Sequence, residues 1–177
     1  MKKKNQWYVI TGAPNAGKTT LIKQLEQRGY KVYHEMARLF IDEKMAQGLT
    51  LKQIRKDELS FQREVLKRKI KLEKKLPKNK MIFFDRGIPD SYAYYKIRGF
   101  KISGLLKKAV LNSAYKKIFL LDYYDYKKDY ARVETRPEQI LLHKLLREAY
   151  EKFGLPVAVV PKLKTKAARV KFILDNL

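Results

Sequence analysis

Residues 7–35, WYVITGAPNAGKTTLIKQLEQRGYKVYHE, form the stretch that decides the fold. An apolar run over residues 7–11 leads into a loop that begins at Gly12, and a helical pattern follows from Lys18. The loop matches the Walker A pattern, in which two glycines separated by four residues precede a lysine and a threonine or serine. A strand, this loop and a helix in that order indicate a binding site for the phosphates of a nucleotide.

The residue types of the loop have chemical reasons. Its glycines permit backbone angles that a Cβ atom would penalise, so that successive N–H groups can point at phosphate oxygens. Lys18 is expected to reach the β- and γ-phosphates, and the Thr19 hydroxyl to bind Mg²⁺. A glycine-rich turn alone would not explain a lysine at a helix start, where a cation opposes the helix dipole. The residues expected to contact the nucleotide are Gly12, Ala13, Pro14, Asn15, Ala16, Gly17, Lys18, Thr19 and Thr20.

Length and composition favour one globular domain over residues 1–177, with 45% hydrophobic and 33% charged residues. The chain has no cysteine, which excludes disulfides and thiolate metal sites and indicates a reducing compartment. The apolar run after the first lysines is too short for a signal peptide, and no transmembrane segment is expected. We therefore expect a cytoplasmic protein.

The formal net charge of +23 is large for this length. A field of this sign attracts polyanions, so nucleic acid or an anionic lipid surface is one possible partner. The other interpretation is that solvated lysines cover the outer faces of the helices, because lysine is mostly exposed in proteins. The composition leaves both interpretations open.

Apolar runs and helical patterns alternate along the chain. Strands are expected at 7–11, 31–34, 81–85, 118–122 and 157–160, and helices at 18–28, 35–47, 89–98, 103–114, 138–153 and 165–174. A capping box at Thr50 and Gln53 predicts a further long helix that ends before Pro77. The alternation predicts an α/β fold with a five-stranded, mainly parallel sheet.

In such a sheet, ligands bind at the carboxyl ends of the strands. Gly12, Glu35, Asp85 and Asp122 fall at four of these ends. Asp85 ends the run MIFFD, as an aspartate that binds Mg²⁺ does in the Walker B arrangement. An aspartate that only caps the next helix is the alternative, and Arg86 argues against it, because an arginine there faces the ligand crevice.

Glu35 follows the second strand, and Arg38 lies on the same face of the next helix. A carboxylate at this place can orient a substrate hydroxyl or accept its proton. It can also serve only to favour the helix N-terminus.

The polar segment DYYDYKKDYARVETRP, residues 122–137, is long for a connection in a compact domain, which favours a functional role. Arg132 and Arg136 would share one face of a helix there. We predict a lid at about 125–137 whose arginines close over the transferred phosphoryl group.

Three segments resemble the NadR-like P-loop family: ITGAPNAGKTTLIKQLEQRGYKVYHEMAR, IFFDRGIPDSYAYYKIRG and KKDYARVETRPEQ. This family includes the ribosylnicotinamide kinase domain of a bifunctional NAD-biosynthesis regulator and the AAA-type domain of translocation-defect proteins. The resemblance implies a three-layer α/β/α P-loop fold of the nucleoside and nucleotide kinase type, with a small lid. Its members include small-molecule kinases and proteins that bind GTP and lipid.

Three functions remain open at this point. The first is a kinase that uses ATP or GTP and Mg²⁺ to phosphorylate a small nucleoside- or nucleotide-like acceptor. The second is a nucleic-acid-binding ATPase or a polynucleotide 5′-kinase, and the third is a non-enzymatic GTP or ATP switch that binds anionic lipid or a protein. For the kinase, the catalytic residues are predicted to be Lys18, Glu35, Asp85, Arg86, Arg132 and Arg136, with Glu35, Arg38, Arg86 and Asp90 at the acceptor.

Overall fold

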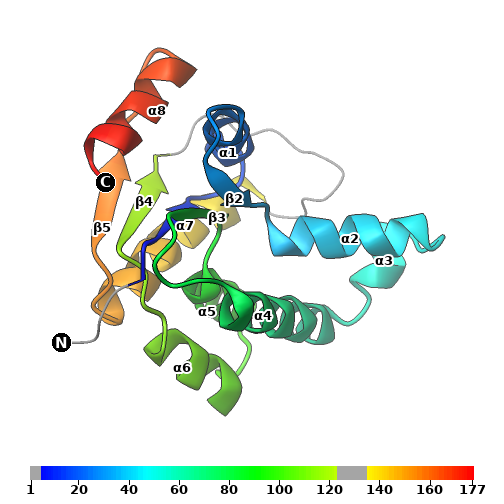
Figure 1. Ribbon diagram of the computed structural model, residues 1–177. Helices are drawn as coiled ribbons and strands as arrows, with labels where there is room; N and C mark the ends of the chain where they lie inside the picture. Colours follow the sequence, from blue (N-terminus) through cyan, green and yellow to red (C-terminus); the bar gives the residue numbers. More distant parts are fainter. Residues whose placement is uncertain (1–4, 123–134) are drawn as a thin grey trace.

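A five-stranded parallel sheet runs through the computed structural model, which describes residues 5–122 and 135–177 (Figure 1). The strand order is β2-β3-β1-β4-β5, and each pair of neighbours is parallel. The strands are β1 (Trp7–Thr11), β2 (Lys31–Tyr33), β3 (Ile82–Asp85), β4 (Lys117–Leu121) and β5 (Val157–Val160). The predicted α/β class and the five-stranded sheet are confirmed.

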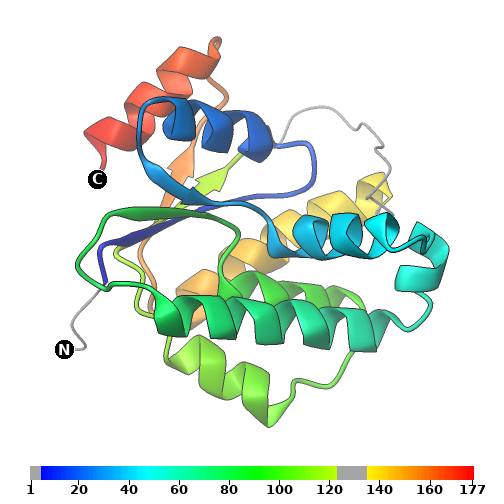
Figure 2. The same cartoon turned by 45° about the vertical axis from the view of Figure 1, so that its right-hand side comes forward.

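Helices cover both faces of the sheet and complete three layers (Figures 1 and 2). The helices are α1 (Lys18–Gln27), α2 (Met36–Ala46), α3 (Leu51–Ile54), α4 (Glu58–Lys75), α5 (Ile88–Ile97), α6 (Gly104–Leu111), α7 (Arg136–Lys152) and α8 (Lys166–Asp175). Helices α1 and α8 share a core with one face of the sheet, whereas α4 to α7 lie on the other side. None of the helices in residues 5–122 and 135–177 is both long and apolar enough to cross a membrane.

The central strand β1 shows why the sequence forms a three-layer fold. Its side chains alternate between the two faces of the sheet. Tyr8 and Ile10 pack into the core beneath α1 and α8, whereas Trp7 and Val9 pack into the opposite core. All four are buried. A strand that is apolar on both faces requires helices on both faces, which is the environment of a parallel sheet.

The prediction of one long helix from Thr50 is wrong, because the segment forms two helices, α3 and α4. The capping box at Thr50 and Gln53 is present, but it opens the short helix α3. The chain then breaks, and Asp57 starts α4 by accepting a hydrogen bond from the Ser60 N–H at 2.9 Å. Asp57 is a strong N-cap residue, and its local hydrogen bonds compete with a continuous helix. The boundaries of the other predicted elements shift by only a few residues.

The loop that connects β1 to α1 requires a glycine at its first position, Gly12. Its φ of 144° lies in a region that essentially only glycine adopts. A Cβ atom there would lie 2.7 Å from the carbonyl oxygen of Leu121, at the end of β4. The chain can therefore leave the sheet at this position only if the residue has no side chain.

Gly12→Ala is expected to destabilise the protein much more than Gly29→Ala, a matched control. Gly29 also has a positive φ, of 85°, but a Cβ atom there would meet no atom within 4 Å. The control should lose about 1 kcal/mol of unfolding free energy for backbone strain alone. Gly12→Ala should lose roughly 2 kcal/mol more, because buried backbone must also shift. Denaturant unfolding measures both, and equal losses would contradict the steric argument.

Candidate active site

The loop between β1 and α1 has the backbone of an anion-binding site. Gly12, Asn15 and Gly17 all have positive φ angles, of 144°, 64° and 84°. Turns that combine left- and right-handed residues present successive N–H groups to an anion. Gly17 caps helix α1 without a side-chain hydrogen bond, and the N-terminus of a helix presents N–H groups that suit an anion.

Lys18 lies inside this loop and is only 3% exposed. Its ammonium donates hydrogen bonds to the carbonyl oxygens of Gly12, at 2.9 Å, and Ala13, at 2.8 Å. Thr19 and Thr20 follow in the first turn of α1, where both are partly buried. The ammonium, the loop backbone and the helix N-terminus therefore present positive charge together.

Arg169 of α8 supports the loop, although nothing in the sequence distinguished it from the many other basic residues. Its Nη1 donates to the Ala16 carbonyl at 3.1 Å, and the side chain is buried. A Cβ atom on Gly17 would lie 2.7 Å from the same nitrogen, so the glycine permits this approach. Burial lowers the pKa of Arg169, and the negative charge of Asp122 partly opposes that effect.

Asp85 is the last residue of β3, and it pairs with Ile10 of β1. Ile10 lies just before the phosphate loop, which begins at Gly12. The side chain is buried, and its Oδ1 atom has no hydrogen-bond partner among the residues that the structure describes. Burial and, to a lesser extent, the charge of Glu35 raise the pKa of Asp85 to about 6, although the charge of Lys18 opposes the rise. A buried carboxylate oxygen without a partner is suited to a cation ligand.

Arg86 connects the phosphate loop to Glu35, which follows β2. It has a φ of 70°, uncommon for a residue with a side chain. Its Nε donates to Glu35 at 3.0 Å, and its Nη1 donates to Asp90 at 3.1 Å and to the Gly12 carbonyl at 3.3 Å. The central carbon of the guanidinium also lies 5.3 Å from the ring centroid of Tyr94. Burial disfavours its charge, yet the surrounding negative groups hold its pKa above the ordinary value.

Asp90 lies beneath the site and is fully buried. It accepts hydrogen bonds from the Thr11 hydroxyl at 2.6 Å, from the Gly87 N–H at 2.9 Å and from the Tyr150 hydroxyl, in addition to Arg86. The sequence predicted Asp90 at the acceptor, but its oxygens are taken up by the protein and it does not line the pocket described next. Asp90 thus contacts Arg86 from below, and its place at the acceptor stays a prediction.

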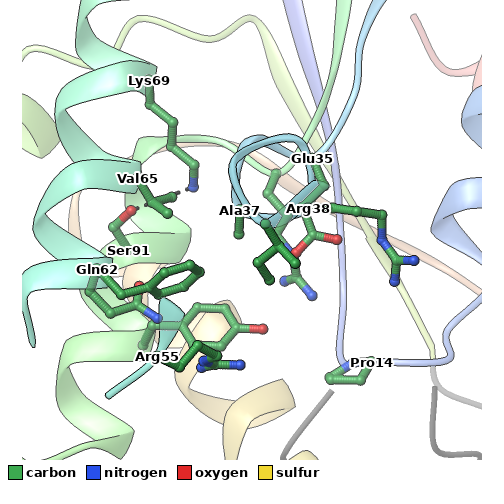
Figure 3. A pocket seen from close by; sticks show the side chains of 13 residues that line it. Pro14, Glu35, Ala37, Arg38, Arg55, Gln62, Val65, Lys69 and Ser91 are labelled. Atoms are coloured by element: carbon green, nitrogen blue, oxygen red, sulfur yellow. Dashed lines mark hydrogen bonds and ion pairs between the residues drawn. The ribbon is translucent and has the colours of Figure 1, made fainter. Parts of the chain in front are cut away.

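A pocket lies beside the loop, between the start of α2 and the helices α4 and α5. Figure 3 shows Glu35, Arg38 and Pro14 on one side of it and Gln62 and Lys69 on the other. Its lining residues also include Arg55, Val65, Arg86, Ser91 and Tyr94. Glu35, Arg38 and Arg86, predicted from two separate motifs, are thus brought together, and Pro14 joins the pocket to the phosphate loop.

The predicted lid lies largely outside the described residues. Residues 123–134, which include Arg132, are not part of the description, and Arg136 is the exposed first residue of α7. Thr135 caps that helix and forms a capping box with Glu138. The lid and its two arginines therefore remain predictions.

The fold and the loop together define a P-loop nucleotide-binding protein. A family model described as an AAA domain matches residues 7–168, and the chain belongs to this AAA domain family. No curated protein sequence matches the chain at a significant level.

Solved structures with the same fold include nucleoside and nucleotide kinases at low sequence identity. Deoxyadenosine kinase from M. mycoides, with the products dCMP and dCDP bound, has a TM-score of 0.67 and 17% identity, covering 96% of this chain and 97% of that one. Thymidylate kinase from Ehrlichia chaffeensis has a TM-score of 0.65 and 16% identity, with 98% of each chain covered. NadR in complex with NR has a TM-score of 0.68 and 15% identity, covering 97% of this chain but 48% of that one. These similarities establish the nucleoside and nucleotide kinase type of P-loop fold.

Asp85→Asn is expected to stabilise the ligand-free protein at pH 8 while it weakens binding of a Mg²⁺–nucleotide complex. A carboxyl whose pKa rises on folding from 3.8 to about 6 favours the folded state only when protonated. Its contribution is fully present below pH 3.8 and is lost as the pH rises through 6. The variant should therefore gain on the order of 3 kcal/mol at pH 8 and about half of that at pH 5. Denaturant unfolding without nucleotide measures this, and a gain independent of pH would contradict it.

Arg169→Met is expected to weaken binding of a non-hydrolysable ATP analogue roughly tenfold, because the loop loses a charge-assisted hydrogen bond at Ala16. Lys171→Met is the matched control, since Lys171 is exposed on the same helix. Calorimetric titration measures both affinities. Equal affinity for wild type and Arg169→Met would show that α8 does not support the loop.

Proposed function

We propose that this protein is a kinase in which ATP, or GTP, donates its γ-phosphoryl group with Mg²⁺ to a small nucleoside- or nucleotide-like acceptor. The observation that carries the proposal is the place of Arg86, which donates both to Gly12 of the phosphate loop and to Glu35 in the adjacent pocket. A donor site and an acceptor pocket that share one side chain suit phosphoryl transfer, because the attacking oxygen must reach the γ-phosphorus. The kinase fold supports the same class of reaction.

The phosphate loop is proposed to bind the triphosphate of the donor. The backbone N–H groups of the loop and of the first turn of α1 would donate to phosphate oxygens. Lys18 would exchange its contacts with the Gly12 and Ala13 carbonyls for the β- and γ-phosphates. Since these contacts already hold the ammonium in the loop, little ordering is required when the nucleotide binds.

Asp85 and Thr19 are proposed to hold Mg²⁺. The partnerless Oδ1 atom of Asp85 fits such a role. The described residues contain no cluster of three or more acidic or histidine side chains that would hold a metal by themselves. This also fits Mg²⁺, which in kinases is bound by one or two protein groups together with phosphates and water. When bound, the ion neutralises charge on the β- and γ-phosphates.

Glu35 and Arg86 are proposed to act on the acceptor side. The acceptor oxygen forms a bond to the γ-phosphorus, the bond from that phosphorus to the β–γ bridging oxygen breaks, and ADP leaves. Glu35 orients the acceptor hydroxyl or accepts its proton. Arg86 stabilises the charge that spreads over the transferred group, and Arg38 contributes to the same pocket. Arg132 and Arg136 are proposed to approach from the lid.

The pocket must widen before it can hold such an acceptor. Its volume is about 50 Å³, which is room for a few water molecules. Arg55 is held beside the pocket by two hydrogen bonds to Glu58, at 2.8 and 2.7 Å, and by the ring of Phe61. Acceptor binding is therefore proposed to move side chains of α2, α4 or α5.

The test is transfer from γ-labelled ATP with Mg²⁺ to nucleosides, nucleotides, ribosylnicotinamide and 5′-hydroxyl oligonucleotides. Label is expected on one small acceptor. Lys18→Ala and Glu35→Gln should each reduce the rate at least about 100-fold, because one loses phosphate binding and the other loses orientation of the acceptor. Lys23→Ala removes an exposed lysine from the same helix as Lys18 and should leave the rate unchanged.

Three results would contradict the proposal. Label on the oligonucleotide alone would support a polynucleotide kinase, for which the net charge of +23 provides attraction. Release of free phosphate alone would indicate an NTPase. Tight nucleotide binding without any transfer would favour the non-enzymatic switch, and binding to anionic vesicles would then be the next measurement.

A further inference from the structure

Lys69 is a buried lysine on the wall of the acceptor pocket. It projects from α4, is 7% exposed, and points toward the space between α4 and Glu35 (Figure 3). Its ammonium donates to the Gly87 carbonyl at 2.8 Å and lies 3.4 Å from the Ser91 hydroxyl oxygen. Both partners are uncharged. Nothing in the sequence marked this lysine, because it is one of many basic residues on α4.

The hydrogen bonds of Lys69 differ from those of two other cations in the pocket. Arg86 is ion-paired with Glu35 and Asp90, and Arg55 is ion-paired with Glu58. The carboxylates of Asp90, Glu35 and Glu73 act on Lys69 only through space. Four of the pocket's lining residues are basic and one, Glu35, is acidic, and the carboxylates of Asp90 and Glu58 pair with two of these cations from outside the lining.

A buried ammonium held only by neutral oxygens is costly for the ligand-free protein. The free-energy cost of removing a charge from water is offset when an opposite charge and further hydrogen bonds contact the buried group. Burial accordingly lowers the pKa of Lys69. An ammonium has three N–H donors, and Gly87 and Ser91 provide two acceptors. An anionic group in the pocket would provide both the third acceptor and the missing charge.

We propose that Lys69 binds an anionic group of the acceptor, and that the acceptor is therefore a phosphomonoester, such as a nucleoside monophosphate, rather than a neutral nucleoside. Lysine binds phosphate as a compact point charge, and a phosphomonoester carries close to two negative charges at neutral pH. This inference rests on the proposed kinase function. It names the class of acceptor, which the fold leaves open because proteins with this fold include kinases of both nucleosides and nucleotides.

The test compares the binding of nucleosides with that of their 3′- and 5′-monophosphates, in the presence of Mg²⁺ and a non-hydrolysable ATP analogue. Calorimetric titration of the full chain is expected to show at least about tenfold tighter binding of a monophosphate than of its parent nucleoside. In Lys69→Met, which removes the charge at similar volume, this ratio should fall toward one. Lys71→Met removes an exposed lysine from the same helix and should leave the ratio unchanged.

The ratio separates binding of an anion from mere support of the turn after β3. If Lys69 only held the Gly87 carbonyl, Lys69→Met would weaken nucleosides and monophosphates equally, and that result would overturn the proposal. Equal wild-type affinity for both classes would overturn it as well, even where the variant fails to fold. Because binding is measured without transfer, a monophosphate preference without kinase activity would refute the proposed function and the acceptor role of the monophosphate, while leaving in place the binding of an anionic group by Lys69.

Discussion

Arg86 places a buried guanidinium between the phosphate loop, the end of β2 and the start of α5, and it does so from a left-handed backbone conformation. A buried charge of this kind is tolerated only when it is paired and hydrogen-bonded. Glu35 and Asp90 meet that requirement from opposite sides. Arg86 therefore connects the phosphate loop to the adjacent pocket, and a change in either carboxylate would disturb both.

The support beneath Arg86 is itself a closed hydrogen-bond network. Asp90 accepts from Thr11 on β1, from the Gly87 N–H and from Tyr150 on α7. A buried polar network in which every member has partners is rigid and specifies one arrangement. Gly87 has no room for a side chain, because a Cβ atom would lie 2.9 Å from the Tyr150 hydroxyl. Helix α7, far along the sequence from the loop, thereby helps to fix the geometry of the site.

The site also concentrates groups that oppose folding. Asp85 is buried with an oxygen that lacks a partner, and Lys69 is a buried ammonium with neutral partners. Each raises the free energy of the ligand-free protein, and each has the charge that a complementary ligand would neutralise. Such unfavourable groups are retained where function requires them. Cation, nucleotide and acceptor are thus expected to complete the electrostatics of the core as well as to bind to it.

The sequence by itself determined the α/β class, the five strands and the phosphate loop, because these depend on local patterns: apolar runs, helical spacing, and glycines before Lys18. It also placed Glu35 and Asp85 at strand ends, where parallel topology brings them to one edge. Only the tertiary structure decided that Asp90 lies beneath the site and that Lys69 and Arg169 reach it. The burial and partners of these residues depend on which helices pack together, and one lysine among many has no local signal that could reveal this.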